Sequence, residues 1–137
     1  MAREVFIDTS GFYALLAKED DRHRQAAEFM QDAAKSRRAF VTTDYILDET
    51  ATLLKARGQS ALLAPFFDRI FASSSCRVAW TDAERFQQTR IFFLKHRDQP
   101  WSFTDCLSFC VMKESRAREA LTKDGHFKAA GFLALLV

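Results

Sequence analysis

The chain has 137 residues, with 20 basic and 18 acidic side chains, a formal net charge of +2, and only four glycines and two prolines. This composition excludes a disordered or collagen-like chain, and the length predicts a single domain over residues 1–137. Because 48% of the residues are hydrophobic and 14 are Phe, we expect a core that needs neither disulfides nor structural metal. The small net charge neither indicates nor excludes a nucleic-acid partner.

The sequence predicts a cytoplasmic protein without a membrane segment. No stretch approaches the roughly 20 apolar residues of a membrane span, and the first residues lack the pattern of a signal peptide. Cys76, Cys106 and Cys110 are therefore expected to be reduced thiols. A zinc site built from Cys106, Cys110, His96 and His126 is the alternative, although no C-x-x-C pair supports it.

Apolar periodicity predicts strands and helices that alternate along the chain. The predicted strands are 4–8, 39–42, 76–80, 120–122 and 132–137. The predicted helices begin near residue 10 and then cover 21–34, 43–56, 60–72, 81–96 and 102–116, with a kink or break at Pro65. This alternation predicts an α/β fold, with a central, mostly parallel sheet of about four to five strands flanked by helices.

Two acidic residues follow predicted strands. Asp8 comes at the end of the first strand and Asp124 follows the fourth. In open α/β sheets, ligands bind outside the carboxyl ends of the strands, so both residues are candidates for a functional site. The structural alternatives are a helix N-cap at Asp8 and an Asp-Gly turn at Asp124.

Two further acids lie on predicted helices among apolar residues. Glu49 is three residues after Ile46 and four before Leu53, so we expect its carboxylate on the apolar face, where an ion pair with Arg or Lys is the structural alternative. Asp105 lies in the first turn of its helix, three residues after Ser102, where a capping box is the alternative.

A cleft that contained all four acids would require compensation of their charge. Mutual repulsion is on the order of 4 kcal/mol for each close pair at an effective dielectric constant of 20. Bound cations or strongly raised pKa values make such a cluster tolerable. Oxygen ligands without a supporting set of His or Cys favour Mg²⁺ or Mn²⁺ over zinc.

The sequence around these acids resembles PIN-domain proteins of the VapC toxin type. The resemblance rests on VFIDTS (5–10), TTDYILDET (42–50), SFTDC (102–106), LTKDGHF (121–127) and AGF (130–132), which together span most of the chain in the family's order. It implies a small PIN-like fold with a parallel sheet and a Mg²⁺- or Mn²⁺-dependent endoribonuclease that cleaves RNA phosphodiester bonds. It also implies a homodimer that a cognate antitoxin protein inhibits, in a type II toxin-antitoxin pair.

The resemblance also assigns roles to individual residues. Asp8 and Asp105 would be the main metal ligands, and Glu49 and Asp124 would complete a catalytic acidic quartet. The hydroxyls that would orient these carboxylates belong to Thr9, Ser10 and Thr104.

Basic residues near the cleft would hold the RNA, or would form an ordinary solvated surface. The candidates lie in the last third of the chain: Lys113, Arg116, Arg118, Lys123 and Lys128. His23 and His126 are expected to be surface or turn residues rather than proton shuttles.

Two other classes of protein remain open. The first is a non-catalytic PIN-like binding or regulatory module, in which the acids cap helices and metal does not affect stability. The second is a Mg²⁺-dependent phosphoryl-transfer or receiver-like protein. That class requires an acidic pair on an early loop, whereas the first strand here ends in the single acid Asp8.

Overall fold

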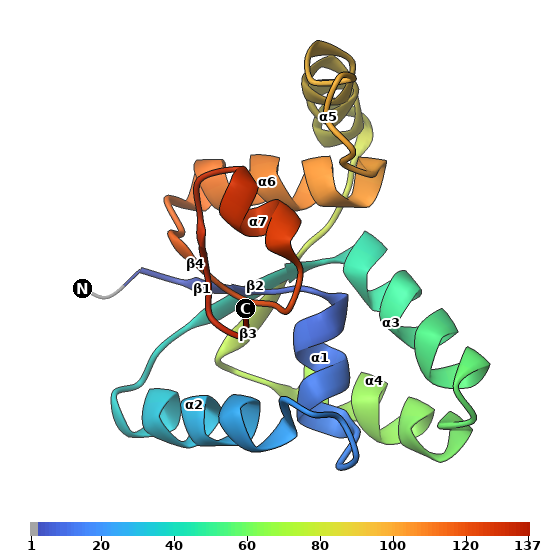
Figure 1. Ribbon diagram of the computed structural model, residues 1–137, viewed down its shortest axis with the longest axis vertical. Helices are drawn as coiled ribbons and strands as arrows, with labels where there is room; N and C mark the ends of the chain where they lie inside the picture. Colours follow the sequence, from blue (N-terminus) through green and yellow to red (C-terminus); the bar gives the residue numbers. More distant parts are fainter. Residues whose placement is uncertain (1–2) are drawn as a thin grey trace.

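The computed structural model describes residues 3–137, and its centre is a five-stranded parallel sheet with strand order β3-β2-β1-β4-β5 (Figure 1). The strands are β1 (Val5–Ile7), β2 (Phe40–Thr43), β3 (Cys76–Ala79), β4 (Glu119–Leu121) and β5 (Leu133–Ala134). Residues of β1 and β2 are all buried, as expected for strands that have helices on both sides.

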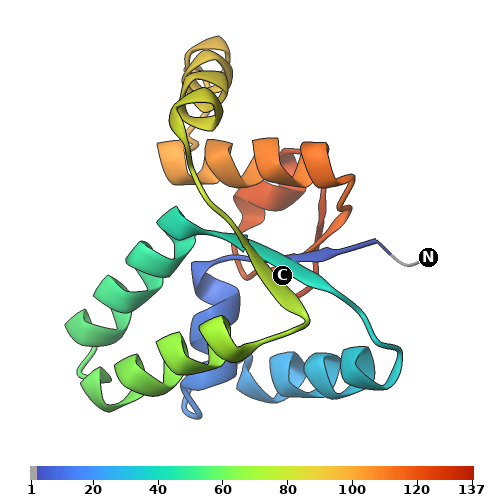
Figure 2. The same ribbon diagram turned by 180° about the vertical axis from the view of Figure 1, so that it is seen from behind.

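Seven α-helices and a single 3₁₀ turn connect the strands in the part of the chain that the structure describes. They are α1 (Thr9–Leu16), α2 (His23–Lys35), α3 (Asp44–Ala56), the 3₁₀ turn (Ser60–Leu62), α4 (Leu63–Ala72), α5 (Ala83–Lys95), α6 (Phe103–Ser115) and α7 (Gly125–Ala129). Helices α6 and α7 lie on one side of the sheet, and α1, α2 and α4 lie on the other (Figures 1 and 2). Helix α5 projects from the body of the molecule above α6.

The strand order reverses direction between β1, the central strand of the sheet, and its neighbour β4. Ile7 pairs with Leu121, so the segments that follow these residues leave the sheet side by side. A reversal of this kind opens a crevice at the carboxyl ends of the two strands. Gly11 allows α1 to start close to this edge, because a Cβ atom there would overlap the carbonyl oxygen of Leu121.

Polar side chains begin five of the helices. The residue at each N-cap accepts a hydrogen bond from a backbone N–H of the first turn, which otherwise lacks a partner. These capping residues are Asp8 for α1, Thr43 for α3, Asp82 for α5, Ser102 for α6 and Asp124 for α7.

The predicted α/β class and parallel sheet are confirmed, and the differences are local. Strand β5 contains only two residues of the predicted 132–137 segment. The five-residue helix α7 was not predicted, since such a short helix has no periodic pattern. Pro65 lies in the first turn of α4, where its missing N–H costs no hydrogen bond, and the preceding residues form the 3₁₀ turn.

Within residues 3–137, no helix has the length and apolar character needed to cross a membrane.

Candidate active site

Asp8 is buried at the carboxyl end of β1, with 5% of its surface exposed. One carboxylate oxygen, Oδ1, accepts hydrogen bonds from the Gly11 backbone N–H and the Ser10 hydroxyl, both at 2.9 Å. The other, Oδ2, accepts a 2.6 Å hydrogen bond from the Thr122 hydroxyl. The capping role that the sequence offered as an alternative is therefore present, and Asp8 is also joined to the end of β4.

Burial raises the pKa of Asp8 from 3.8 to about 7, because the charged form loses its hydration. The hydrogen bonds from Thr122, Gly11 and Ser10 act in the opposite direction, and the nearby charge of Asp124 adds a further rise. A buried carboxyl group with a strongly raised pKa and a nearby charged partner is a candidate for a functional role.

Thr122 links Asp8 to Asp124, a role that the sequence analysis did not identify. Its hydroxyl donates to Asp8 and accepts a 2.9 Å hydrogen bond from the Asp124 backbone N–H. The Ser10 hydroxyl makes a parallel connection, because it donates to Asp8 and accepts a 2.8 Å hydrogen bond from the Lys123 backbone N–H. The ends of β1 and β4 are thus held together by two hydroxyl groups.

The side chains of Asp105, Asp124 and His126 form a compact cluster beside this connection. Each offers one potential metal-ligand atom, and these atoms lie within 4.8 Å of one another. His126 Nδ1 is 3.1 Å from Asp105 Oδ2 and 3.5 Å from Asp124 Oδ1. Among residues 3–137, this is the only group of three such side chains close enough to share an ion.

Helix capping uses one carboxylate oxygen of each acid in this cluster. Asp105 Oδ2 accepts the Ser102 backbone N–H at 3.1 Å, and the Ser102 hydroxyl accepts the Asp105 backbone N–H at 3.0 Å, which completes the expected capping box. Asp124 Oδ1 accepts the His126 backbone N–H at 2.9 Å. Within the described part of the chain, no donor is hydrogen-bonded to Oδ1 of Asp105 or Oδ2 of Asp124, so both atoms are available to a ligand.

Glu49 lies outside this cluster, on an exposed position of α3 rather than on its apolar face. The expectation of a place on the apolar face is wrong because the buried side of α3 is centred on other positions: Ile46, Leu47, Thr50 and Leu54. Glu49 also has no Arg or Lys partner among residues 3–137, which removes the ion-pair alternative in that range. Its carboxylate instead accepts a short hydrogen bond from the hydroxyl of Thr9, the residue after Asp8.

The three predicted orienting hydroxyls make different contacts. Ser10 donates to Asp8, and Thr9 donates to Glu49. The side chain of Thr104 lines a shallow pocket with Glu49, and no hydrogen bond joins its hydroxyl to a carboxylate of the described chain.

The structure contradicts the zinc alternative. His96 packs against Phe92 and Trp101, with ring centroids 4.4 and 5.5 Å apart, whereas His126 contacts Asp105. All three cysteines are free thiols. Among residues 3–137, the one group of three ligand atoms that are close enough to share an ion contains no cysteine.

Most of the basic residues that were candidates for holding RNA do not form a surface at this edge of the sheet. Arg116 and Arg118 precede β4, so they lie at the opposite end from Asp124. Lys113 lies over the Phe92 ring, 4.6 Å from its centroid. Lys123 is paired with Asp20 and Asp21 at 3.3 and 2.6 Å, whereas Lys128 is exposed on α7, next to the cluster in sequence.

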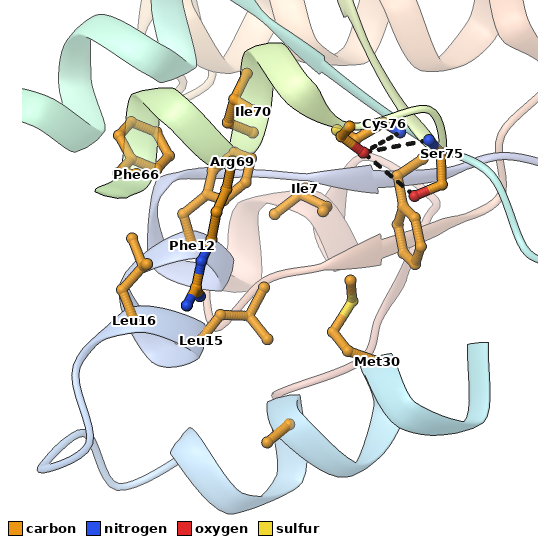
Figure 3. Close-up of a pocket in the computed structure, with 13 residues that line it drawn as sticks. Ile7, Phe12, Leu15, Leu16, Met30, Phe66, Arg69, Ile70, Ser75 and Cys76 are labelled. Carbon is orange, nitrogen blue, oxygen red and sulfur yellow. Dashed lines mark hydrogen bonds between the residues drawn. The ribbon is translucent and has the colours of Figure 1, made fainter. Parts of the chain in front are cut away.

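A separate apolar cavity of about 360 Å³ lies between α1, α2 and α4 (Figure 3). Its lining includes Phe12, Leu15, Met30 and Phe66, and the side chain of Arg69 extends across it. Among residues 3–137, no carboxylate lies within ion-pair distance of Arg69. The cavity has no acidic lining residue and is thus a different kind of site from the cluster.

Comparison with known proteins places this arrangement in a family. The chain is 34% identical over 130 residues to the "23S rRNA-specific endonuclease VapC20" of two Mycobacterium tuberculosis strains, covering 94% of this chain and 95% of the relative. It is 29% identical over 117 residues to the "VapC ribonuclease" of Archaeoglobus fulgidus, covering 83% of this chain and 73% of that protein. The crystal structure of M. tuberculosis VapC20, described as a "Sarcin-Ricin loop cleaving toxin", superimposes with a TM-score of 0.81 at 31% identity, covering 95% of this chain and 97% of that one.

The family model described as "PIN domain" matches residues 5–133, which include all five strands except the last residue of β5. Together with the parallel sheet and the acids at the ends of β1 and β4, this match shows that the chain belongs to the PIN domain family.

Proposed function

We propose that the chain is a divalent-metal-dependent endoribonuclease, a hydrolase of RNA phosphodiester bonds that acts as the toxin of a type II toxin-antitoxin pair. The cluster of Asp105, Asp124 and His126 beside buried Asp8 carries this proposal. The names of the relatives support the reaction class. The proposed enzyme acts in the cytoplasm as one PIN domain over residues 1–137.

The donor set fits a divalent ion. Asp105 and Asp124 each keep a carboxylate oxygen free of hydrogen bonds from residues 3–137, and the ligand atoms of the cluster are close enough to share one cation. Oxygen-rich sites of this kind suit Mg²⁺ or Mn²⁺. When bound, such an ion supplies charge stabilisation at the scissile phosphate and an activated water.

The protein's own residues would position this chemistry. Asp105 and Asp124 hold the ion, and Ser10 and Thr122 fix the orientation of the Asp8 carboxylate beside them. With a pKa near 7, Asp8 exchanges a proton in the neutral range when no cation is close. Glu49 on α3 accepts the hydroxyl of Thr9, the residue after Asp8, and would add a further carboxylate to the acidic quartet.

The test compares Asp105→Asn with the wild type in cleavage of purified 23S ribosomal RNA and total RNA, with Mg²⁺ or Mn²⁺. Asparagine keeps an acceptor for the Ser102 N–H, so we expect a folded protein without metal-dependent cleavage. Asp82→Asn, at the exposed cap of α5, is the matched control and should cleave normally. A wild type that cleaves no RNA, or an active Asp105→Asn, contradicts the proposal. The non-catalytic alternative predicts, in addition, that millimolar Mg²⁺ or Mn²⁺ leaves the melting temperature unchanged.

The proposed enzyme is a homodimer that associates through α5. Phe86, Ile91 and Leu94 on this projecting helix are exposed to solvent, with 62% of the Ile91 surface accessible. Exposed apolar side chains gathered on one element favour a protein interface.

The apolar cavity is the site proposed for the antitoxin. Its apolar lining, together with Arg69, which has no carboxylate partner in the part of the chain that the structure describes, suits an apolar segment that carries an acidic residue. Arg69→Glu should weaken co-purification with a co-expressed antitoxin while the rate of RNA cleavage is unchanged, and unchanged co-purification would exclude this site.

A further inference from the structure

His126 contacts two of the four acidic residues that were predicted to hold the metal, Asp105 and Asp124. Its Nδ1 atom lies 3.1 Å from Asp105 Oδ2 and 3.5 Å from Asp124 Oδ1, so it is the atom that joins the two carboxylates. Its side chain is 39% exposed, compared with 17% for Asp105 and 36% for Asp124. The imidazole and Asp124 are therefore the more accessible members of the cluster, and Asp105 is the least exposed.

The fold holds His126 in this position. Its backbone N–H donates to the Asp124 carboxylate, which fixes the start of α7 to the end of β4. The next residue, Phe127, is buried and packs against Phe6 and Phe109, with ring centroids 6.0 and 5.0 Å apart. These contacts fix the backbone of His126 beside the cluster, and its ring lies 3.1 Å from Asp105 Oδ2.

The spacing of the three groups is that of ligands on a single ion. A metal with bonds of about 2.1–2.2 Å to each ligand places neighbouring ligand atoms about 3 Å apart. The two distances from His126 Nδ1 to Asp105 Oδ2 and Asp124 Oδ1, 3.1 and 3.5 Å, are close to this value. Each of these oxygens also accepts a capping N–H, and the second lone pair of the same oxygen, or the other oxygen of the carboxylate, is left for an ion.

A nitrogen ligand changes which ion is preferred. Mg²⁺ binds oxygen ligands and retains water, whereas imidazole suits first-row transition ions. Mn²⁺ accepts both carboxylate oxygen and imidazole nitrogen, so a mixed set of two carboxylates and one imidazole favours Mn²⁺ over Mg²⁺.

We propose that His126 supplies a nitrogen ligand which, with Asp105 and Asp124, makes the metal site selective for Mn²⁺ over Mg²⁺. The inference rests on the proposed function for the presence of an ion. It adds a nitrogen ligand and a preference for Mn²⁺, neither of which the carboxylates alone determine. In the alternative, His126 only orients Asp105 through a hydrogen bond and never contacts the ion.

The experiment is pulsed electron paramagnetic resonance of the full-length, metal-stripped protein loaded with Mn²⁺, which detects a bound ¹⁴N nucleus directly. The chain has three histidines. We expect nitrogen modulation in the wild type and its loss in His126→Gln. His96→Gln is the control, since that ring packs against Phe92, and should keep the modulation.

Competition between Mn²⁺ and Mg²⁺, followed by calorimetry, gives the second measurement. His126→Gln should lower the ratio of Mn²⁺ to Mg²⁺ affinity by about tenfold or more. Bound Mn²⁺ without nitrogen modulation in the wild type would overturn the inference while leaving the proposed ribonuclease intact. Nitrogen modulation in a protein that cleaves no RNA would support the inference and contradict the proposed function. A wild type that binds no Mn²⁺ contradicts both.

Discussion

Replacement of Asp8 by Asn tests whether burial of this carboxyl group destabilises the folded protein at neutral pH. The pKa of Asp8 is about 7 in the folded chain, compared with 3.8 for the ordinary group. Between about pH 4 and pH 7 the unfolded chain therefore loses this proton before the folded chain does. The raised pKa means that the folded state loses stability as pH rises through this range, and that the loss is complete above pH 7.

The size of the effect follows from the pKa difference. At about 1.4 kcal/mol for each tenfold change in acidity, the full cost of ionising Asp8 in the fold is on the order of 4 kcal/mol. Asparagine carries no charge and still accepts the Gly11 N–H, but it disturbs the hydrogen bond from Thr122, at a cost of about 1 kcal/mol at every pH. We expect Asp8→Asn to be more stable than the wild type by roughly 0.5 kcal/mol at pH 5, where only part of the ionisation cost is present, and by about 3 kcal/mol at pH 8.

Urea unfolding followed by circular dichroism at pH 5, 6, 7 and 8, in buffer with a chelator, measures this growing difference in stability. Asp82→Asn is the control because it changes the same residue type at an exposed helix cap, and we expect it to keep the pH dependence of the wild type. A difference between Asp8→Asn and the wild type that stays constant from pH 5 to pH 8 would refute the reasoning. Mn²⁺ at pH 8 should restore stability to the wild type more than to Asp8→Asn, since a nearby cation favours the ionised form.

Two further substitutions test the connection between the strands and the proposed dimer. Thr122→Val keeps the side-chain shape but removes the hydroxyl that donates to Asp8, so it should raise the pKa of Asp8 further and destabilise the fold by about 1–3 kcal/mol, as measured by urea unfolding across the same pH range. A stability equal to that of the wild type would show that the hydroxyl does not support Asp8. Ile91→Glu places a charge on the exposed face of α5 and should convert a dimer to a monomer in analytical ultracentrifugation, with the melting temperature of each subunit nearly unchanged. If the wild type sediments as a monomer, the proposed interface is wrong.

The elements that the sequence predicted well are those with strong patterns. The run at 5–7 ends in an acid and leads into a helix, and the structure places Asp8 at that junction as the N-cap of α1. The Ser102 and Asp105 spacing predicted a capping box, which is present. Such local features follow from sequence because they depend on neighbours only a few residues away.

The features that the sequence did not predict depend on contacts between distant segments. His126 belongs to a helix too short to have a period, and its approach to Asp105 joins residues 21 positions apart. Thr122 contacts Asp8 across 114 positions, because β1 and β4 are neighbours in the sheet. The Asp-Gly-His sequence at 124–126 and the Thr two residues before Asp124 were the available signals, and neither indicates a partner without the strand order.

Helix capping and metal binding need not be alternative roles for these acids. A capping carboxylate uses one oxygen for the backbone N–H, and in Asp105 and Asp124 the second oxygen remains free. The positive end of the helix macrodipole also favours the ionised form that a cation requires. In Asp8, by contrast, both oxygens accept hydrogen bonds from the protein and the side chain is more deeply buried. Asp105 and Asp124 therefore each have an oxygen left for a ligand, whereas the protonation of buried Asp8 changes near neutral pH. For this reason substitution of Asp8 should change the pH dependence of stability, and substitution of Asp105 should change metal binding.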